Sequence, residues 1–306
     1  MALTYGEISA ITEKYFHKKL VDNIFDSNTL LQRSRKKGWY ETIPGGESIM
    51  VPVAYATTTA AGWYSGADTL STTKNDQITA LNFDWKFAYA SITINRADEL
   101  KNSGPQQIID LVKSKVQLAE KTLADNIGTG LYNAGTTTDA IIGLRLAVDS
   151  TGTYGGISRT DYSWLAAQED STTTTLSIKK LQNICGDATV GNAKPTVITT
   201  TQDIWDDYFS LLQPQQRFQD SETANGGFQS LLFAGSPMIV DSHCPASNLF
   251  ALNEDYLSFK AHKDENFRFE EFTKPVNQNV SSAKVYWAGA LCCSNPRLQG
   301  KMTALV

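Results

Sequence analysis

Hydrophobic and polar residues alternate with little interruption from Leu81 to Asn95. One set of alternate positions is polar and includes Asn82 and Asp84. The other set carries large apolar side chains. That apolar set is Leu81, Phe83, Trp85, Phe87 and Tyr89. Alternation with a period of two predicts a half-buried β-strand. We therefore expect one strand whose apolar face is covered partly by its own chain and partly by another surface.

A second alternating segment runs from Ile49 to Tyr55. Pro52 within it cannot donate to a strand ladder, so we expect an edge strand or an exposed ribbon. The residues between the two strands, Thr57–Gln77, are small, polar and aperiodic. A connection of this length without its own structure usually serves function or binds a partner. Trp63 and Tyr64 near its middle are candidate contact residues, and packing back on the ribbon is the alternative.

Helical periodicity marks two long segments. Gly6–Asp26 reads as an amphipathic helix that has no core of its own to lie on. Ser103–Leu131 reads as the longest helix, with Ser103 as its N-cap and with Gly128 and Gly130 at its end. Its apolar stripe is Ile108, Val112, Val116, Ala119, Leu123 and Ile127. We expect this helix to be a structural beam of the fold.

The remaining chain alternates short helices with short strands. Residues 176–185 and 202–213 are expected to be helices, and residues 195–201 an apolar strand between them. Short strands follow to the C-terminus, with a turn at Asn295-Pro296. The pattern indicates the α+β fold class, and the sequence has no internal repeat and no obvious interdomain linker.

Composition narrows the classes of function. The net charge is −5, which argues against direct gripping of nucleic acid, because phosphate binding needs a basic surplus. One basic run, Arg33–Lys37, is either a solvated turn after a helix or a contact to a neighbouring acidic surface or DNA. Arg33 and Arg35 are its candidate contact residues. No apolar run reaches the length of a membrane-spanning helix.

A search for reactive residues finds little. His243 and Cys244 lie near Asp241, but adjacent residues in an extended chain project apart, which argues against a Cys–His pair. Asp203, Asp206 and Asp207 fall at a helix start, where carboxylates favour the positive end of the helix dipole. We expect no enzymatic activity, no cofactor and no metal. We also expect thiols at all four cysteines, which are Cys185, Cys244, Cys292 and Cys293.

The order of elements is a helical arm, a two-stranded ribbon, a beam helix, a mixed α/β unit and returning strands. This order resembles the major capsid protein of tailed bacteriophages, the Hong Kong 97-type fold. Several phrases between Glu41 and Asp255 are similar to those of one branch of that family. They include GWYSGADTLSTT, WKFAYASITIN, TYGGISRTDYSW, LLQPQQRF, GGFQSLLFAGSPMIVD and NLFALNED.

The resemblance implies a division of the chain. It gives residues 1–40 as an N-terminal arm and residues 41–95 as an extended β-ribbon loop with its flanking strands. It gives residues 96–175 as a peripheral domain with the spine helix, and residues 176–265 as an α/β axial domain. Residues 266–306 would return to the peripheral domain and supply the C-terminal strands.

The same resemblance implies a structural function. The chain would form pentamers and hexamers of an icosahedral shell around double-stranded DNA. The shell would contact the packaged DNA only weakly and without sequence specificity. Its location would be the virion, after assembly in the host cytoplasm, with a scaffolding protein, a portal and a possible decoration protein as partners. A prokaryotic nanocompartment shell that packages an enzyme is the alternative, and a soluble hydrolase is a third. Candidate inter-subunit contacts are Trp63, Tyr64, Lys74, Trp85, Arg33 and Arg35.

Two departures from the family lead to further expectations. Many relatives carry a long N-terminal scaffolding segment, whereas the arm here starts near Met1. Either assembly uses a separate scaffolding protein, or the chain begins after removal of that segment, and the initiator Met favours the former. Some relatives join subunits through a lysine–asparagine isopeptide bond assisted by a glutamate. Lys74 and either Asn277 or Asn279 would suit the bond, but residues 283–301 contain no Asp or Glu. We therefore expect a shell held by non-covalent contacts.

Overall fold

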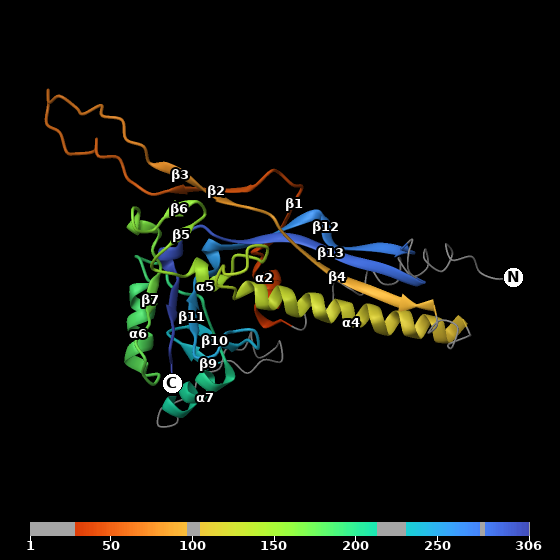
Figure 1. The fold of residues 1–306 in the computed structure, drawn as a ribbon. Coiled ribbons are helices and arrows are strands. Elements are labelled where there is room, and N and C mark those ends of the chain that lie inside the picture. Colours follow the sequence, from red (N-terminus) through yellow and green to blue (C-terminus); the bar gives the residue numbers. More distant parts are fainter. Residues whose placement is uncertain (1–27, 97–104, 213–230, 276–278, 306) are drawn as a thin grey trace.

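The computed structural model describes residues 28–96, 105–212, 231–275 and 279–305. Two sheets, each with its own helices, form the body, and a two-stranded ribbon leaves it (Figure 1). Two hydrophobic clusters fill the body. The larger one surrounds the four-stranded sheet and extends to one face of the six-stranded sheet, and the smaller one lies on the other face of the six-stranded sheet. The expected N-terminal helix Gly6–Asp26 lies outside the described residues.

The four-stranded sheet has the order β1-β12-β13-β4. Its strands are β1 (Tyr40–Ile43), β12 (Leu257–Thr273), β13 (Val280–Cys293) and β4 (Lys86–Asn95). The long helix α4 (Pro105–Leu131) packs along β4 and β13, as Figure 1 shows. Its buried positions include Val116, Ala119, Leu123 and Ile127. The predicted beam helix is therefore confirmed, and so is the described part of its apolar stripe.

Helix α4 ends at Leu131, as predicted, with Gly128 and Gly130 in its last turn, whereas Ser103, its expected N-cap, lies outside the described residues. Gly128 also has a role in packing. A Cβ atom at Gly128 would lie 2.5 Å from Nδ2 of Asn28 and 2.7 Å from the ring of His243. Glycine at this position allows two other segments to contact the helix backbone.

The six-stranded sheet has the order β7-β14-β11-β8-β10-β9. Its strands are β7 (Gln168–Asp170), β8 (Val197–Thr200), β9 (Leu231–Phe233), β10 (Ser236–Val240), β11 (Leu249–Leu252) and β14 (Gly300–Met302). Helix α6 (Ile178–Asp187) packs near β14 and β7, and helix α7 (Gln202–Leu212) packs on β10. The two predicted helices and the strand between them are confirmed within a few residues.

The ribbon consists of β2 (Ile49–Ala54) and β3 (Ile78–Phe83) in antiparallel pairing. Pro52 lies in this two-stranded sheet, as its missing N–H donor predicts. The ribbon thus forms as expected, with its connection reaching away from the body (Figure 1).

The prediction of a single long strand after the connection is wrong. The chain breaks between β3 and β4, and the break reverses which alternate positions face the core. Leu81 and Phe83 are at most 2% exposed, whereas Phe87 and Tyr89 are 73% and 64% exposed. Buried positions in β4 are instead Ala90, Ile92 and Ile94. The reason is tertiary: β3 pairs with the ribbon strand β2, whereas β4 pairs with β13.

Helix α2 (Thr29–Lys37) precedes β1 and contains the basic run. Asn28 caps its N-terminus by accepting from the backbone N–H of Leu31, and Gly38 ends it with a φ of 79°. The run was expected to be a turn after a helix and is part of the helix itself. The remaining short elements are α5 (Leu144–Ala147), β5 (Thr153–Tyr154), β6 (Ile157–Ser158), η1 (Ser163–Leu165), η2 (Glu254–Tyr256) and η3 (Pro296–Leu298).

The loops around β5 and β6 form a platform beneath the ribbon. The backbone N–H of Asn82 donates to the carbonyl of Gly155 at 2.9 Å, and the rings of Phe83 and Tyr154 meet edge to face. The hydroxyl of Tyr154 accepts from the backbone N–H of Cys293 at 2.9 Å. The platform therefore ties the root of the ribbon to the end of β13.

Arg159 holds this platform together. Its guanidinium is buried and donates to four backbone carbonyls. The acceptors are Leu146, Ala147, Thr151 and Leu165. Burial lowers the pKa of Arg159 from its ordinary value, and nearby Asp149 opposes that shift. The side chain thus replaces the water that these carbonyls would otherwise bind.

We expect Arg159→Met to destabilise the subunit strongly. Each buried carbonyl left without a donor costs about 1–3 kcal/mol, so we expect a total loss of roughly 3 kcal/mol or more. Urea unfolding of the purified chain would measure this loss. Arg145→Met is the matched control, since Arg145 is exposed and its variant should unfold like the wild type. Equal stabilities for the two variants would contradict the assigned role of Arg159.

Candidate assembly surfaces

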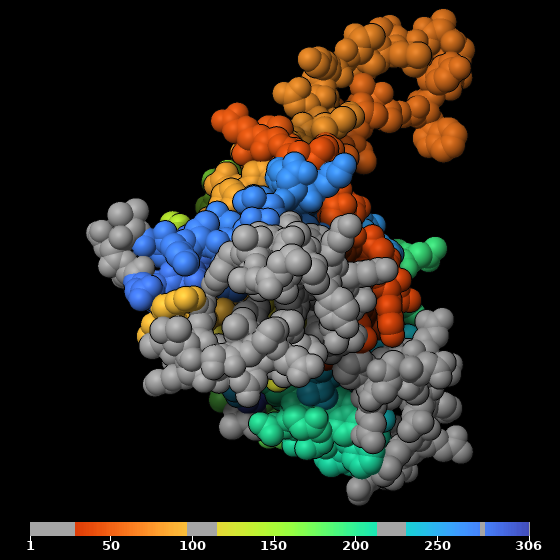
Figure 2. All heavy atoms as spheres, turned by 90° about the vertical axis from the view of Figure 1, so that its right-hand side faces the viewer, coloured from red at the N-terminus to blue at the C-terminus, as the bar shows by residue number. Residues whose placement is uncertain are grey.

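The connection between β2 and β3 stands clear of the molecule (Figure 2). Its base is closed by the backbone N–H of Tyr55, which donates to the carbonyl of Gln77 at 3.0 Å. Farther out, Thr59 and Asn75 bond to each other across the loop at 2.7–3.0 Å. The loop is therefore held by its own base and its own cross-contacts, and its outer part is open to a partner.

Apolar side chains occupy both faces of the ribbon. Ile49, Leu81 and Phe83 on the inner face are buried against the body. Most outward positions are nevertheless apolar and exposed, with cross-strand neighbours such as Ala54 and Ile78, and Asn82 is the polar exception. Exposed large hydrophobic residues of the ribbon and its loop are Met50, Trp63, Tyr64, Leu70 and Ile78. An exposed apolar surface of this kind marks an interaction site.

Trp63 and Tyr64 do not pack back on the ribbon strands. Trp63 is fully exposed and Tyr64 is mostly exposed, so the packing alternative does not hold in the isolated subunit. Lys74 is exposed in the same loop. That these three residues touch a neighbouring subunit stays a prediction.

Trp85 lies at the base of the ribbon and is held by its own subunit. Its indole Nε1–H donates to the carbonyl of Gly46 at 2.8 Å, and its ring meets the ring of His262 edge to face at 5.3 Å. The side chain is half-buried. Any contact of Trp85 with a neighbour would therefore use only the remaining open part of the ring.

A second apolar surface lies on the four-stranded sheet. Phe87 and Tyr89 of β4 are exposed, and Tyr89 is paired with Tyr286 of β13. The hydroxyl of Tyr286 donates to Glu270 at 2.8 Å, and the guanidinium of Arg268 lies 5.5 Å from the centre of the Tyr286 ring. The sequence placed Phe87 and Tyr89 on one face with Leu81 and Phe83, covered partly by its own chain and partly by another surface. It did not show that a strand break at residues 84 and 85 separates the buried pair from the exposed pair.

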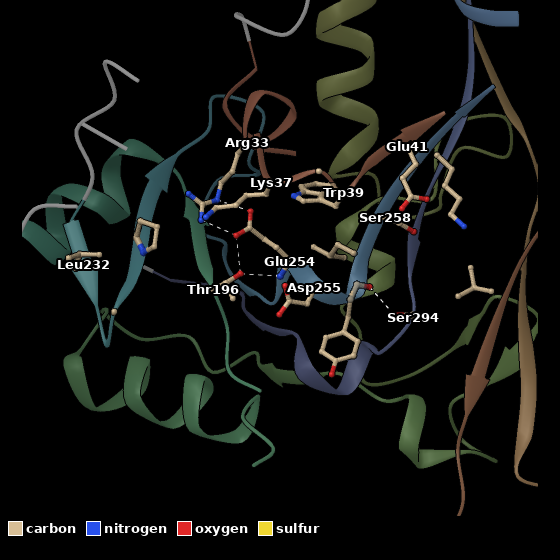
Figure 3. A pocket seen from close by; sticks show the side chains of 17 residues that line it. Arg33, Lys37, Trp39, Glu41, Thr196, Leu232, Glu254, Asp255, Ser258 and Ser294 are labelled. Atoms are coloured by element: carbon tan, nitrogen blue, oxygen red, sulfur yellow. Dashed lines mark hydrogen bonds and ion pairs between the residues drawn. The ribbon is translucent and has the colours of Figure 1, made fainter. Parts of the chain in front are cut away.

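The basic helix α2 finds an acidic partner within its own chain. Arg33 forms a two-pronged ion pair with Glu254, with N–O distances of 2.7 and 2.9 Å. Glu254 also accepts from the hydroxyl of Thr196 at 3.0 Å. Figure 3 shows these side chains on one wall of a cleft of about 770 Å³. Arg35 is exposed on the same helix, and its contact with a neighbour stays a prediction.

The described residues offer little for nucleophilic chemistry. Burial raises the pKa of the Cys244 thiol, which faces the carbonyl of Asn248 and not His243. Burial also raises the pKa of Cys292 and of Cys293 to about 12, so both are protonated at neutral pH. The described parts of the chain contain no cluster of three or more metal-ligating side chains. In those parts, no helix is both long and apolar enough to cross a membrane.

Comparison with known proteins gives matches in structure only. No family model matches the sequence, and no curated protein matches it. The capsid of cyanophage A-1(L) aligns with a TM-score of 0.66 and 16% identity, covering 88% of this chain and 90% of that one. The capsid of a native GTA particle aligns at 0.61 and 11% identity, with coverage of 92% and 91%.

A third solved structure is the holo-SrpI encapsulin complex of Synechococcus elongatus. It aligns with a TM-score of 0.59 and 9% identity, covering 87% of this chain and 84% of that one. Identities this low establish the fold alone. The chain therefore has the fold that these phage-capsid and encapsulin proteins share, and the predicted α+β capsid fold is confirmed.

Proposed function

We propose that this chain, which has the capsid fold, is the major capsid protein of a tailed bacteriophage. It assembles into an icosahedral shell that encloses double-stranded DNA, and its role is structural and not enzymatic. The observation that carries the proposal is the projecting ribbon, which is apolar on both faces although only one face is covered by its own subunit. A second copy of the chain would bury the other face and gain its hydrophobic free energy.

The proposed division of the subunit follows its two large sheets. The four-stranded sheet with α4 is the peripheral domain, and the six-stranded sheet with α6 and α7 is the axial domain that meets its copies at the symmetry axes. The axial sheet also takes β7 and β14, which come from outside residues 176–265. Ribbon residues Trp63, Tyr64 and Lys74 would contact the neighbouring subunit.

A nanocompartment shell is the second candidate, since an encapsulin complex shares the fold. The phage assignment is favoured because phage capsids are more numerous among the similar structures, such as those of Gordonia phage Cozz and Mycobacterium phage Bobi. On this assignment the shell forms in the host cytoplasm with a scaffolding protein and a portal, and a decoration protein is a further partner. The acidic chain would touch the packaged DNA only weakly.

Size and content of the assembled particles test the proposal. The full chain, expressed with the genes that neighbour it, should elute as particles and appear as shells by electron microscopy. Nuclease-resistant DNA inside shells from infected cells supports the phage assignment, and a single packaged enzyme supports the nanocompartment. A chain that stays a small oligomer in all these preparations would contradict both.

We also expect the shell to contain no covalent links between subunits. Lys74 is exposed, Asn277 lies outside the described residues, and Asn279 is exposed at the start of β13. Residues 283–301 supply no carboxylate to take the lysine proton. Denaturing gels of mature particles, with and without reductant, should show one band near 33.6 kDa.

A ladder of multimers that survives boiling and reductant would contradict this expectation. Glu270 would then be the candidate carboxylate that takes the lysine proton, because the sheet brings it beside β13 from the neighbouring strand β12. Lys74→Arg particles would then decide whether the link uses this lysine, because arginine keeps the charge but cannot form the amide.

A further inference from the structure

Three elements that are distant in sequence meet at the side chain of His243. Asn28 comes from the N-cap of α2, Asp125 comes from α4, and Asp241 comes from the turn after β10. The ring of His243 is largely buried between them. A Cβ atom at Gly128 would lie 2.7 Å from this ring, so the backbone of α4 closes the space on one side.

Two groups compete for one ring nitrogen of His243. Nδ1 lies 3.3 Å from Oδ1 of Asp241 and 3.5 Å from Nδ2 of Asn28. The amide of Asn28 cannot simply be turned over, since its Oδ1 accepts from the N–H of Leu31 at 3.1 Å. Nδ1 can accept from the Asn28 amide only when it carries no proton, and it can donate to Asp241 only when it does.

We propose that His243 is a proton-operated toggle between the N-cap of α2, Asn28, and the turn after β10, at Asp241. In the protonated state, Nδ1–H donates to Asp241 and Nε2–H faces Asp125, whose Oδ1 is 3.6 Å away. In the neutral tautomer that keeps its proton on Nε2, facing Asp125, Nδ1 accepts from Asn28, and Asp241 loses its cationic partner. One proton therefore decides which of two elements the ring binds.

The groups around the ring favour the charged state. Asp241 is buried, and among the described residues its ion-pair partner is His243. The N–H of Leu30 at the start of α2 also donates to Asp241, at 3.3 Å. Asp125 on α4 is 64% exposed and adds a second negative charge. The pKa of His243 is accordingly raised, first by the bond to Asp241, while burial opposes the shift.

Other polar and titratable groups lie near the His243 ring, on the same turn, just after α4 and around a neighbouring cavity. The turn itself adds the buried thiol of Cys244 and the hydroxyl of Ser242, whose Oγ is 3.4 Å from Nδ1. Burial raises the pKa of Tyr132, just after α4, and Asp241 adds to that rise. His243 also lines a cavity of about 610 Å³ whose other charged residues are Lys86, Asp139 and Arg145. Close contacts to the ring are thus dominated by the two carboxylates.

The raised pKa fixes the direction of the pH effect. A histidine whose pKa is higher in the folded state contributes stability that is fully present below its unfolded value of about 6.5. That stability is lost as the pH rises through the higher, folded-state pKa. We therefore expect the junction of α2, α4 and β10 to be held more firmly at mildly acidic pH than at alkaline pH.

The test is a titration of His243 in the unassembled full-length chain. The ring Cε1–H signals of the three histidines are followed by NMR from pH 5 to 9, and His17→Gln and His262→Gln variants assign them. Asp125→Asn should lower the pKa of His243, because it removes a negative charge from an exposed position. Asp161→Asn, the same change at an exposed site on another element, should leave it unchanged.

Asn28→Ser is the decisive variant. Serine can still cap α2, but it lacks the amide that donates to the neutral ring, so the pKa of His243 should rise. A role of Asn28 in capping alone would leave the titration unmoved. The toggle is overturned if His243 titrates at the ordinary value in the wild type, or if Asn28→Ser leaves its pKa unmoved. Because these measurements use the single subunit, they stand apart from any failure to form shells.

Discussion

Removal of the ribbon connection is expected to leave a folded subunit that cannot form stable shells. The variant deletes Thr57–Gln77 and inserts an Asn-Gly dipeptide after Ala56. Since Ala54 and Ile78 are already paired, the new loop has four residues, a common length for a hairpin. The loop contributes nothing to either hydrophobic cluster, so the subunit should keep its circular dichroism spectrum and melting temperature. Shell formation is measured by size-exclusion chromatography and electron microscopy.

A control separates the reach of the connection from its contacts. It replaces Thr57–Gln77 with a Gly/Ser linker of equal length, which keeps the reach but removes Trp63, Tyr64 and Leu70. If those side chains bind the neighbouring subunit, this variant should also fail to form shells. Normal particles from the shortened variant would show that the ribbon tip plays no part in assembly.

Val116→Asp is expected to abolish folding rather than assembly. Val116 is fully buried among hydrophobic residues where α4 packs against the four-stranded sheet. An unpaired carboxylate there costs several kcal/mol, a large part of the roughly 5–15 kcal/mol that stabilises a protein domain. Circular dichroism and thermal melting of the soluble fraction measure the effect.

Leu118→Asp is the matched control on the same helix. Leu118 lies two residues away and is mostly exposed, so its variant should melt close to the wild type. The pair distinguishes burial from a general intolerance of the helix to charge. A Val116→Asp subunit that melts like the Leu118→Asp subunit would contradict the position of α4 in the core.

Where burial follows a local period, the sequence predicted the structure well. The stripe of α4 is buried at Val116, Leu123 and Ile127, because residues three and four apart share one face of a helix. Pro52 placed its strand in a two-stranded ribbon because it lacks an N–H donor. The polar composition of residues 57–77 likewise indicated a connection without a core. These properties depend only on neighbours along the chain.

The candidate site was predicted less completely. The ribbon loop was anticipated, but two points were left open. The sequence did not decide whether Trp63 and Tyr64 pack back on the ribbon, and it did not show which part of the Leu81–Tyr89 face its own chain covers. Alternation shows that a strand has two faces, and it does not show which sheet the strand joins. The pairing of β4 with β13 made that choice.

The sequence by itself determined the elements: a beam helix, a two-stranded ribbon with a long connection, and two short helices around a buried strand. Only the tertiary structure decided what those elements meet. Arg33 pairs with Glu254 across 221 positions, and Gly128 gives His243 and Asn28 access to the backbone of α4. Such contacts join residues far apart in the chain, so they leave no periodic signal, and only the packing of the sheets and helices brings the partners together.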